Sequence, residues 1–336
     1  MDGPEPPDVD DIEAQLADRF DDTPYREIQR LGRGASASVF EVEHRELGNR
    51  FVAKLLHTWL ADDPQVVERM LREGRALAKI SHPHLVDILA SGYTATGLPY
   101  LIMNRLVGCD LREELKKGPL PLLDALRYCT QALSALHCAH SAGIIHRDVK
   151  PENIFLHRET SGEVTVKILD LGLAKIREHE EGSRFAEAQY PTEEGERVGT
   201  PHYMAPEQVE GGEPIDRRAD VYALGLVLYE VLVGAGPFDH YESTAGILQA
   251  HLHVRPDPLS KRTSRRIPRD LEQAVMKATA KDPAQRFGSA AEMEEELARI
   301  TRAEELRSLV AAPFVLSAVL GGGLTFALLR FLFPLR

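Results

Sequence analysis

Cysteine is scarce in this sequence, which has three cysteines among 336 residues. They are Cys109, Cys129 and Cys138, and no two of them are spaced as a CxxC pair. An odd number without paired spacing argues against a disulfide framework or a structural zinc site and fits a reducing compartment. Because Cys129 and Cys138 fall in an apolar helical pattern, we expect them to pack in a helix core.

An excess of basic residues is also missing. The formal net charge is −12, and two acidic segments account for it, because residues 1–22 carry −8 and residues 177–197 carry −4. The rest of the chain is balanced, so it has no basic signature of nucleic-acid binding and we expect no nucleic-acid partner. The first residues are acidic and proline-rich, whereas a secretory signal is basic and then apolar, so we expect no signal peptide.

The order of the hydrophobic patterns predicts an α+β chain in two unequal lobes. Residues 1–24 contain little to bury, so we expect a flexible acidic tail. Short strands with one helix follow from residue 25, and the pattern after Gly108 is mostly helical. The expected strands span residues 26–31, 38–44, 50–57, 85–92, 99–106, 154–156 and 165–169. The expected helices begin at Pro64 after an Asp63 N-cap, at Leu122 with a C-cap near Gly143, at Ala219, at Asp270 and at Ala290, the last ending near residue 300.

One long uncharged run lies near the end of the sequence. Residues 309–329 comprise 21 residues without a charge, enough for a helix of roughly 30 Å, the thickness of a bilayer's hydrocarbon core. A buried core helix is the alternative, but the run has no polar face and follows the helical domain. We therefore expect a transmembrane helix at 309–329, a juxtamembrane linker at 301–308 and a short tail at 330–336, with the large charged body on the cytoplasmic side.

A glycine-containing turn joins the first two expected strands. Gly32 and Gly34 permit a tight turn whose backbone N–H groups can approach phosphates. The strand–turn–strand placement argues against a dinucleotide-binding turn, which would lead into a helix. Taken alone, the turn is also consistent with an ordinary hairpin.

A lysine lies inside the third expected strand. Lys54 follows an apolar run, where an unpaired charge is unfavourable. Glu73 lies at the edge of the apolar face of the following helix and is a suitable partner. Two solvated surface charges are the alternative interpretation.

Two polar clusters follow apolar strands further along the chain. Asp148, Lys150 and Asn153 fall within six residues, and Asp170 ends the strand that leads to Gly172. Asn153 and Asp170 offer hard oxygen ligands, which suit Mg²⁺ bridging phosphates. Asp148 is placed to accept a hydroxyl proton. The order of the clusters, after Lys54 and Glu73, argues against coincidence.

Together these motifs resemble those of the eukaryotic-type (Hanks-type) Ser/Thr protein kinases, most of all their bacterial membrane-attached members. The resemblance covers about residues 25–300. It implies a protein-kinase fold with a small β-rich N-lobe and a larger helical C-lobe, and ATP and Mg²⁺ as cofactors. It also implies transfer of the ATP γ-phosphate to Ser/Thr hydroxyls of cytoplasmic proteins. A pseudokinase or membrane-tethered scaffold and a small-molecule phosphotransferase are the alternatives.

The resemblance assigns roles residue by residue. Asp148 matches the catalytic base, Lys150 the lysine near the transferred phosphate, and Asn153 and Asp170 the metal ligands. Lys150 favours Ser/Thr over Tyr specificity. The expected nucleotide-binding residues are Gly32, Gly34, Val39, Lys54 with its partner Glu73, the gatekeeper Met103, and Asn104, Arg105 and Leu106 of the hinge.

Further matches concern the scaffold and the substrate. The segment ending at Glu207 matches the end of the activation segment, with Arg286 as the partner of Glu207 and Asp220 as a brace of the catalytic loop. Glu152 and Glu230 match positions that contact a basic residue near the phosphoacceptor in some family members; ordinary loop and helix acids are the alternative. The departures are Ala37 for a lid glycine, Val52 for an alanine, and Leu171 for a phenylalanine.

Regulation and location complete the expectations. Arg147 precedes Asp148 and would pair with a phosphate on the activation loop, where Ser183 and Thr192 are the candidate acceptors, so autophosphorylation is expected. Small residues at Ala318 and Gly322 would let two membrane spans pack as a homodimer. We expect a single-pass protein of the bacterial inner membrane with no ligand-sensing ectodomain.

Overall fold

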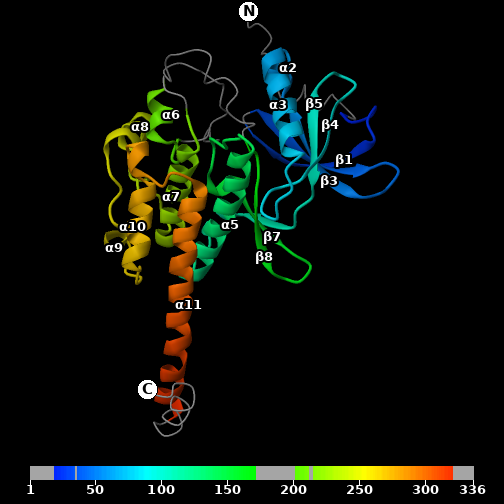
Figure 1. Ribbon diagram of the computed structural model, residues 1–336. Coiled ribbons are helices and arrows are strands. Elements are labelled where there is room, and N and C mark those ends of the chain that lie inside the picture. Colours follow the sequence, from blue (N-terminus) through cyan, green and yellow to red (C-terminus); the bar gives the residue numbers. More distant parts are fainter. Residues whose placement is uncertain (1–18, 35, 172–200, 212–214, 321–336) are drawn as a thin grey trace, which may run out of the picture.

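A computed structural model describes residues 19–34, 36–171, 201–211 and 215–320, except for the side chains of 311–320. The chain forms a β-sheet lobe and a helical lobe (Figure 1). The first third of the described chain, up to Asn104, supplies the sheet lobe, and the mostly helical chain that follows builds the other lobe. This arrangement confirms the predicted α+β fold in two unequal lobes.

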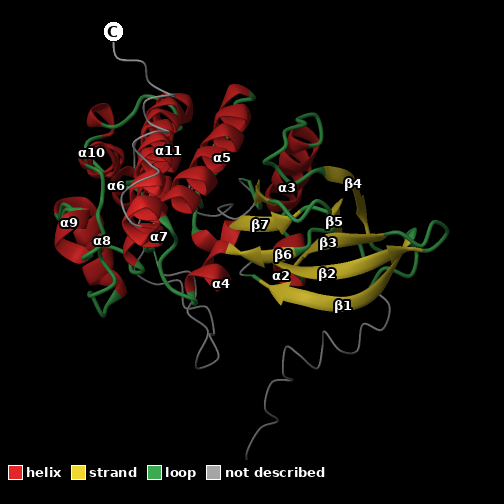
Figure 2. Ribbon diagram, turned by 90° about the horizontal axis from the view of Figure 1, so that it is seen from below, coloured by secondary structure: helices red, strands yellow, loops and turns green. Residues whose placement is uncertain are grey.

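A single antiparallel sheet forms the core of the N-lobe, with strand order β1-β2-β3-β5-β4 (Figure 2). The strands are β1 (Tyr25–Arg33), β2 (Ala37–His44), β3 (Arg50–Leu56), β4 (Ile88–Tyr93) and β5 (Pro99–Asn104). Ala37, which takes the place of a glycine in the resembling family, is buried as the first residue of β2. Register in the central strands pairs Val39 with Lys54 and Val52 with Met103.

Two helices, α2 (Thr58–Ala61) and α3 (Pro64–Leu77), follow β3. The Asp63 side chain accepts a hydrogen bond from the backbone N–H of Gln65, which confirms the predicted start of α3. The apolar face of α3 packs on β5. A Cβ atom at Gly74 would lie 2.7 Å from Leu101 Cδ2, so any larger residue here would require the Leu101 side chain to shift.

The ordered N-lobe begins before residue 25. Phe20 belongs to the segment predicted as a flexible tail, yet its side chain is completely buried. Its ring packs edge-on against Phe40 and Tyr100, with centroids 6.0 and 5.7 Å away. The acidic composition of the segment gave no sign that Phe20 would be buried, because one aromatic residue changes the average hydrophobicity of a short segment very little. Residues 1–18 lie outside the described residues.

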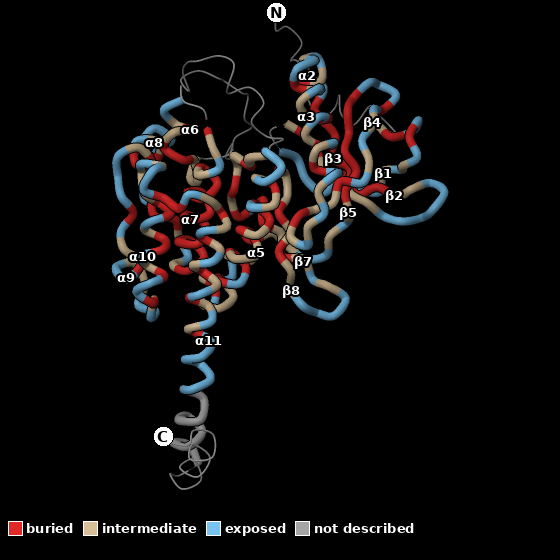
Figure 3. The backbone as a smooth tube through the Cα atoms, in the orientation of Figure 1, coloured by how far each residue is buried: buried red, intermediate tan, exposed pale blue. Residues whose placement is uncertain are grey.

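The C-lobe combines a small antiparallel sheet with helices. Its strands are β6 (Gly108–Asp110), β7 (Ile154–Arg158) and β8 (Val164–Ile168). Its helices are α4 (Leu111–Leu115), α5 (Leu122–Ser141), α6 (Pro206–Glu210), α7 (Arg218–Val233), α8 (Thr244–His253), α9 (Leu259–Arg262), α10 (Arg269–Ala278) and α11 (Ala290–Leu320), with 3₁₀ turns η1 (Pro151–Asn153) and η2 (Pro283–Gln285). Helix α7 is the centre of this lobe (Figure 3), because every residue from Ala219 to Leu232 is buried.

Helix α11 is one continuous helix that leaves the body of the C-lobe (Figure 1). Met293, Leu297 and Ile300 on its first turns are buried, whereas Leu306 and Leu309 further on are exposed. The segment 301–308, predicted as a linker, is helical and continues α11 without a break.

Among the described residues, no helix is both long and apolar enough to cross a membrane. The expected transmembrane helix at 309–329 falls mostly outside that description, wholly for 321–329 and in its side chains for 311–320. The tail at 330–336 also lies outside it.

Candidate active site

The catalytic loop between α5 and β7 holds the Asp148 carboxylate from two sides. Lys150 Nζ lies 2.8 Å from Asp148 Oδ2. The Asn153 side-chain amide donates hydrogen bonds to Asp148 O at 2.8 Å and to Asp148 Oδ2 at 3.1 Å. Within the described residues, Asp148 Oδ1 makes no contact of this kind. The carboxylate is therefore oriented by the loop and keeps one oxygen for a substrate hydroxyl.

Asp220 at the start of α7 braces this loop, as predicted. Its two carboxylate oxygens accept hydrogen bonds from the backbone N–H groups of His146 and Arg147, both at 2.8 Å. His140 Nε2 on α5 lies 2.7 Å from Asp220 Oδ2. Arg147 has a φ of 64°, a left-handed conformation that is costly for a residue with a Cβ. The buried carboxylate stabilises this conformation, because it satisfies the two backbone donors that the turn leaves free.

The loop that carries Asp170 lies beside the catalytic loop. The backbone N–H of Leu169 donates to Asn153 O at 2.9 Å, and His146 Nε2 lies 2.9 Å from Leu169 O. Asp170 has a φ of 54°, and Lys54 Nζ lies 2.6 Å from its Oδ1. Burial acts to raise the pKa of Asp170, but the Lys54 ammonium outweighs it, so the pKa lies below its usual range. The contact joins the two lobes.

The predicted ion pair between Lys54 and Glu73 is wrong for this conformation. Lys54 is neutralised by Asp170 instead, and Glu73 Oε2 is buried without a hydrogen-bond partner. Burial raises the pKa of Glu73 to about 7, although Arg69, Arg72 and Arg147 act to lower it. The buried Nε of Arg147 also has no hydrogen-bond partner among the described residues. Helix α3 thus places Glu73 in the electrostatic neighbourhood of the catalytic-loop arginine.

Asn153 and Asp170 are suitable ligands for Mg²⁺. Asn153 uses its amide nitrogen on Asp148, which leaves its side-chain oxygen as a ligand. Asp170 is engaged by Lys54 through Oδ1, which leaves Oδ2. No group of three or more His, Cys, Asp or Glu side chains that could hold a metal occurs in the described part of the chain. The two oxygens therefore fit an ion that takes its other ligands from phosphates and water.

The predicted nucleotide-binding residues lie along β1, β2, β3 and β5. The turn at Gly32 and Gly34 is closed by a hydrogen bond from Gly34 N–H to Ala37 O at 2.9 Å. Val39 is half-buried, Lys54 and Met103 are buried, and Asn104 ends β5. Leu106 follows in the segment between β5 and β6, which connects the lobes. Of this set, Val39 lies opposite Lys54 across β2 and β3, and Lys54 contacts Asp170.

The hinge is tied to the sheet by a residue that the sequence did not reveal. The Glu41 side chain on β2 is only 1% exposed, and Arg105 Nε of the hinge lies 2.8 Å from its Oε1. Gln29 and Arg50 donate to the same carboxylate at 2.7 and 3.2 Å. Glu41 is one of two acids in β2, and the sequence did not show that its partners would come from β1, β3 and the hinge at once.

The end of the activation segment is anchored by the predicted pair. Arg286 is fully buried and forms two hydrogen bonds of 2.7 Å with the two oxygens of Glu207. Its remaining donors reach the carbonyl oxygens of Ala280, Arg218 and Lys281. This bidentate, fully satisfied geometry is the favourable form of a buried ion pair. The rest of the segment, residues 172–200 with Ser183 and Thr192, lies outside the described residues.

The two acids that match substrate-contacting positions already have a partner. Arg112 on α4 donates from Nε to Glu152 Oε1 at 2.9 Å and from Nη1 to Glu230 Oε1. Its Nη2 donates to the Tyr203 hydroxyl oxygen, and that hydroxyl donates to Glu230 Oε2. No sequence motif indicated Arg112, because its partners come from three distant segments.

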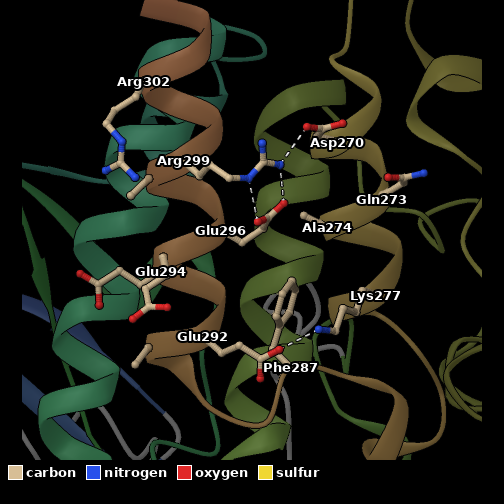
Figure 4. Close-up of a pocket in the computed structure, with 13 residues that line it drawn as sticks. Asp270, Gln273, Ala274, Lys277, Phe287, Glu292, Glu294, Glu296, Arg299 and Arg302 are labelled. Carbon is tan, nitrogen blue, oxygen red and sulfur yellow. Dashed lines mark hydrogen bonds and ion pairs between the residues drawn. The ribbon is translucent and has the colours of Figure 1, made fainter.

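A hollow of about 900 Å³ on the C-lobe lies between α10 and α11 (Figure 4). None of the predicted site residues lines it. Its charged side chains largely neutralise one another, because Arg299 pairs with Asp270 and Glu296, and Lys277 pairs with Glu292. Five acids and three bases line the hollow, so these ion pairs leave only a small negative excess.

A lysine–acid contact between a sheet lobe and a helical lobe, beside an oriented aspartate, is the arrangement expected of a protein-kinase fold. The protein kinase domain family matches residues 25–297, and the chain belongs to that family.

Curated relatives with this domain are Ser/Thr protein kinases. Serine/threonine-protein kinase Pkn1 of Myxococcus xanthus is 39% identical over 284 residues, which cover 84% of this chain and 39% of Pkn1. PknB of Mycobacterium tuberculosis is 35% identical over 296 residues, 87% of this chain and 44% of PknB. The chain thus spans about two fifths of the length of these relatives. The PknI kinase domain of Mycobacterium tuberculosis superposes with a TM-score of 0.64 at 27% identity, covering 84% of this chain and 99% of that domain.

Proposed function

We propose that this chain is a Ser/Thr protein kinase that transfers the γ-phosphate of ATP to serine and threonine hydroxyls of proteins. The observation that carries the proposal is the Asp148 carboxylate, oriented by Lys150 and Asn153 with one oxygen uncommitted. The names of the curated relatives support a serine/threonine acceptor.

In this proposal each site residue has one task. Asp148 Oδ1 accepts the proton of the attacking hydroxyl, and Lys150 lies beside it to stabilise negative charge on the transferred group. Lys54 contacts the ATP phosphates, and Val39, Met103, Asn104 and Leu106 surround the base. Mg²⁺ held by Asn153 and Asp170 would neutralise charge on the phosphates.

The experiment is ³²P transfer from ATP to a generic protein substrate by the full chain in detergent with Mg²⁺. The matched control is Asp148→Asn, which keeps the shape of the side chain but cannot accept the proton. We expect the substitution to lower the rate by roughly 10²–10⁴-fold, the usual contribution of a general base. A folded wild type that binds ATP but transfers no more phosphate than the control would instead indicate a pseudokinase.

The same proposal includes autophosphorylation of the activation loop. It is supported by Arg147, whose buried Nε has no hydrogen-bond partner within the described structure and would suit a phosphate. Mass mapping of the labelled wild type is expected to find phosphate between residues 175 and 200.

We also propose that a helix at 309–329 holds the kinase domain to a membrane, with that domain in the cytoplasm. The uncharged composition of this segment supports the proposal, as does α11, which runs unbroken from the C-lobe to Leu320. The full chain is expected in the membrane fraction after a carbonate wash, and a chain ending at residue 305 in the supernatant. Recovery of both chains in the same fraction would contradict this attachment. The suggested homodimer contact involves Gly322, which lies outside the described residues.

A further inference from the structure

A cluster of four side chains next to the catalytic loop has no role in the proposed phosphoryl transfer. It consists of Arg112, Glu152, Tyr203 and Glu230, which come from α4, η1, the end of the activation segment and α7. Arg112 donates one hydrogen bond to each of the other three side chains. A single guanidinium thus satisfies two acids and a hydroxyl at once, through three of its donors.

One member of the cluster, Glu152, lies in the same loop as Asp148. Glu152 is four residues after Asp148 and precedes Asn153, whose amide holds the Asp148 carboxylate. An extended peptide rises about 3.3 Å per residue, so a side chain two or three residues from the acceptor reaches roughly 7–10 Å. A neighbour of the phosphoacceptor therefore comes close to Glu152.

The charges of the cluster define what the site would bind without Arg112. The Glu230 side chain is 5% exposed and the Glu152 side chain 43% exposed. Two carboxylates, one of them buried, form a site for a cationic side chain, because an unpaired buried carboxylate is unfavourable. The Arg112 side chain, 35% exposed, supplies that cation from within the chain.

We propose that Arg112 is a specificity-determining residue, which occupies the acidic subsite beside Asp148 in place of a basic side chain of the substrate. The wild-type enzyme then gains little from an arginine or lysine near the phosphoacceptor. Removal of the Arg112 side chain opens the subsite to a substrate arginine. This inference rests on the proposed kinase activity.

Three features hold Arg112 in this position. Asp110 caps α4 by accepting a hydrogen bond from the backbone N–H of Glu113 at 2.8 Å, so the helix that carries Arg112 is locally fixed. The Tyr203 hydroxyl donates to Glu230, which orients the buried acid. Opposite charges on Arg112 and Glu230 complete the pair. Burial and these partners together keep the guanidinium in place when a neutral peptide is bound.

The test uses the full chain in detergent and a set of peptides with one serine and a uniform neutral background. Each peptide carries arginine or alanine at one position within four residues of the serine. The enzymes are the wild type, Arg112→Ala, Arg112→Ala combined with Glu152→Gln, and Arg127→Ala. Arg127 is a matched control, because it forms an exposed ion pair with Asp124 on α5, outside the cluster. The readout is the ratio of kcat/KM for the arginine and alanine peptides.

We expect a ratio near one at every position for the wild type and Arg127→Ala. Arg112→Ala should raise the ratio about tenfold or more at one position, since a charge-assisted hydrogen bond to a carboxylate discriminates by at least that factor. The double variant should lose most of this gain. A wild-type ratio that is already tenfold at one position would overturn the proposal, as would an active Arg112→Ala enzyme with a ratio of one everywhere.

The wild-type ratio makes the test independent of whether Arg112→Ala folds. A further arm uses Arg112→Lys, which keeps a cation in the subsite and is expected to retain a ratio near one. If the wild type phosphorylates no peptide and no protein, the kinase activity itself is refuted. Activity with the wrong ratios refutes only the role of Arg112.

Discussion

Lys54 can be neutralised by either of two acids, and which one it contacts decides whether Glu73 has a cationic partner. Lys54 contacts Asp170 across the two lobes, while Glu73 is buried without a hydrogen-bond partner for Oε2. Asp170 and Glu73 are both carboxylates, and a lysine ammonium can form an ion pair with either. As long as Lys54 pairs with Asp170, it does not neutralise Glu73. Burial then favours the protonated, uncharged form of Glu73 over the carboxylate.

This state predicts a pH dependence of stability at one residue. The pKa of Glu73 is about 7, above its ordinary value of 4.5. Between these values the folded chain retains a proton that the unfolded chain releases, so this group makes stability fall as pH rises from about 4.5 to 7. Glu73→Gln should remove the effect, and its melting temperature should exceed that of the wild type by a few degrees at pH 8 but not at pH 4.5.

The control for that measurement is Glu68→Gln, an exposed acid on the same helix. Its melting curve should follow the wild type at each pH. Equal pH dependence in Glu73→Gln and the wild type would show that Glu73 is ionised without cost in the folded chain.

Sequence motifs located single residues better than their contacts. Asp148, Asn153 and Asp170 were predictable because local spacing carries their chemistry, and Glu207 and Arg286 pair as expected. The partner of Lys54 was not predictable, because two acids compete for it and the choice depends on how α3 packs. Glu41 and Arg112 escaped notice for a related reason, since their contacts come from segments far apart in sequence.

At the scale of elements, an aromatic residue extends the N-lobe beyond its sheet. Phe20 is completely buried against Phe40 and Tyr100, and Thr23 next to it donates from Oγ1 to Phe20 O at 2.7 Å. The segment before β1 is therefore part of the lobe core. Its Phe20 ring joins a cluster of buried side chains from the sheet, which includes Phe40 and Tyr100.

Phe20→Ala should destabilise the chain by about 3–5 kcal/mol, because a buried phenylalanine is replaced by a cavity. Urea unfolding followed by tryptophan fluorescence or circular dichroism measures the loss. Leu47→Ala serves as control, since the Leu47 side chain is 67% exposed and its removal should change little. A loss of unfolding free energy for Phe20→Ala as small as that for Leu47→Ala would mean that the Phe20 contacts do not stabilise the chain.

Local signals predicted the long elements, and tertiary packing decided the short ones. Asp63 and Pro64 mark the start of α3, and the predicted helix from Leu122 is α5. Helices of four or five residues such as α2, α4 and α9 were not predicted, because they are shorter than the window in which a 3.6-residue period can be recognised. The ten-residue α8 was also missed. Helix α11 exceeded its predicted end near residue 300, because the charged residues after Ile300 continue the helical period.

At the scale of the whole molecule, α11 is part of the C-lobe core at its start and extends beyond the C-lobe further on. Its first turns carry Met293, Leu297 and Ile300 into the C-lobe core, and Glu304 near the surface accepts from Arg266 at 2.9 Å. Residues 305–310, which form the next turns, are exposed. The boundary between core and extension therefore falls close to Glu304, inside a helix and not at a loop.

A chain ending at residue 305 should keep the melting temperature of the full chain within a few degrees, because every buried side chain described for α11 is retained. A chain ending at residue 289 should be insoluble or melt far lower, since it exposes the surfaces of α5 and α10 that α11 covers. Thermal melting of the purified proteins tests both. A stable chain ending at 289 would show that α11 is dispensable for the C-lobe.

The unbroken course of α11 has a mechanical consequence. A helix turns 100° and advances 1.5 Å with every residue, and no loop in the described part of α11 can absorb a rotation. One residue inserted after Leu306 would swing the C-lobe by about a quarter of a revolution relative to the helix end, whereas seven residues would nearly restore its bearing. The number of residues between Glu304 and Leu320 thus sets the orientation of Asp148 about the helix axis, relative to the end of α11 at Leu320.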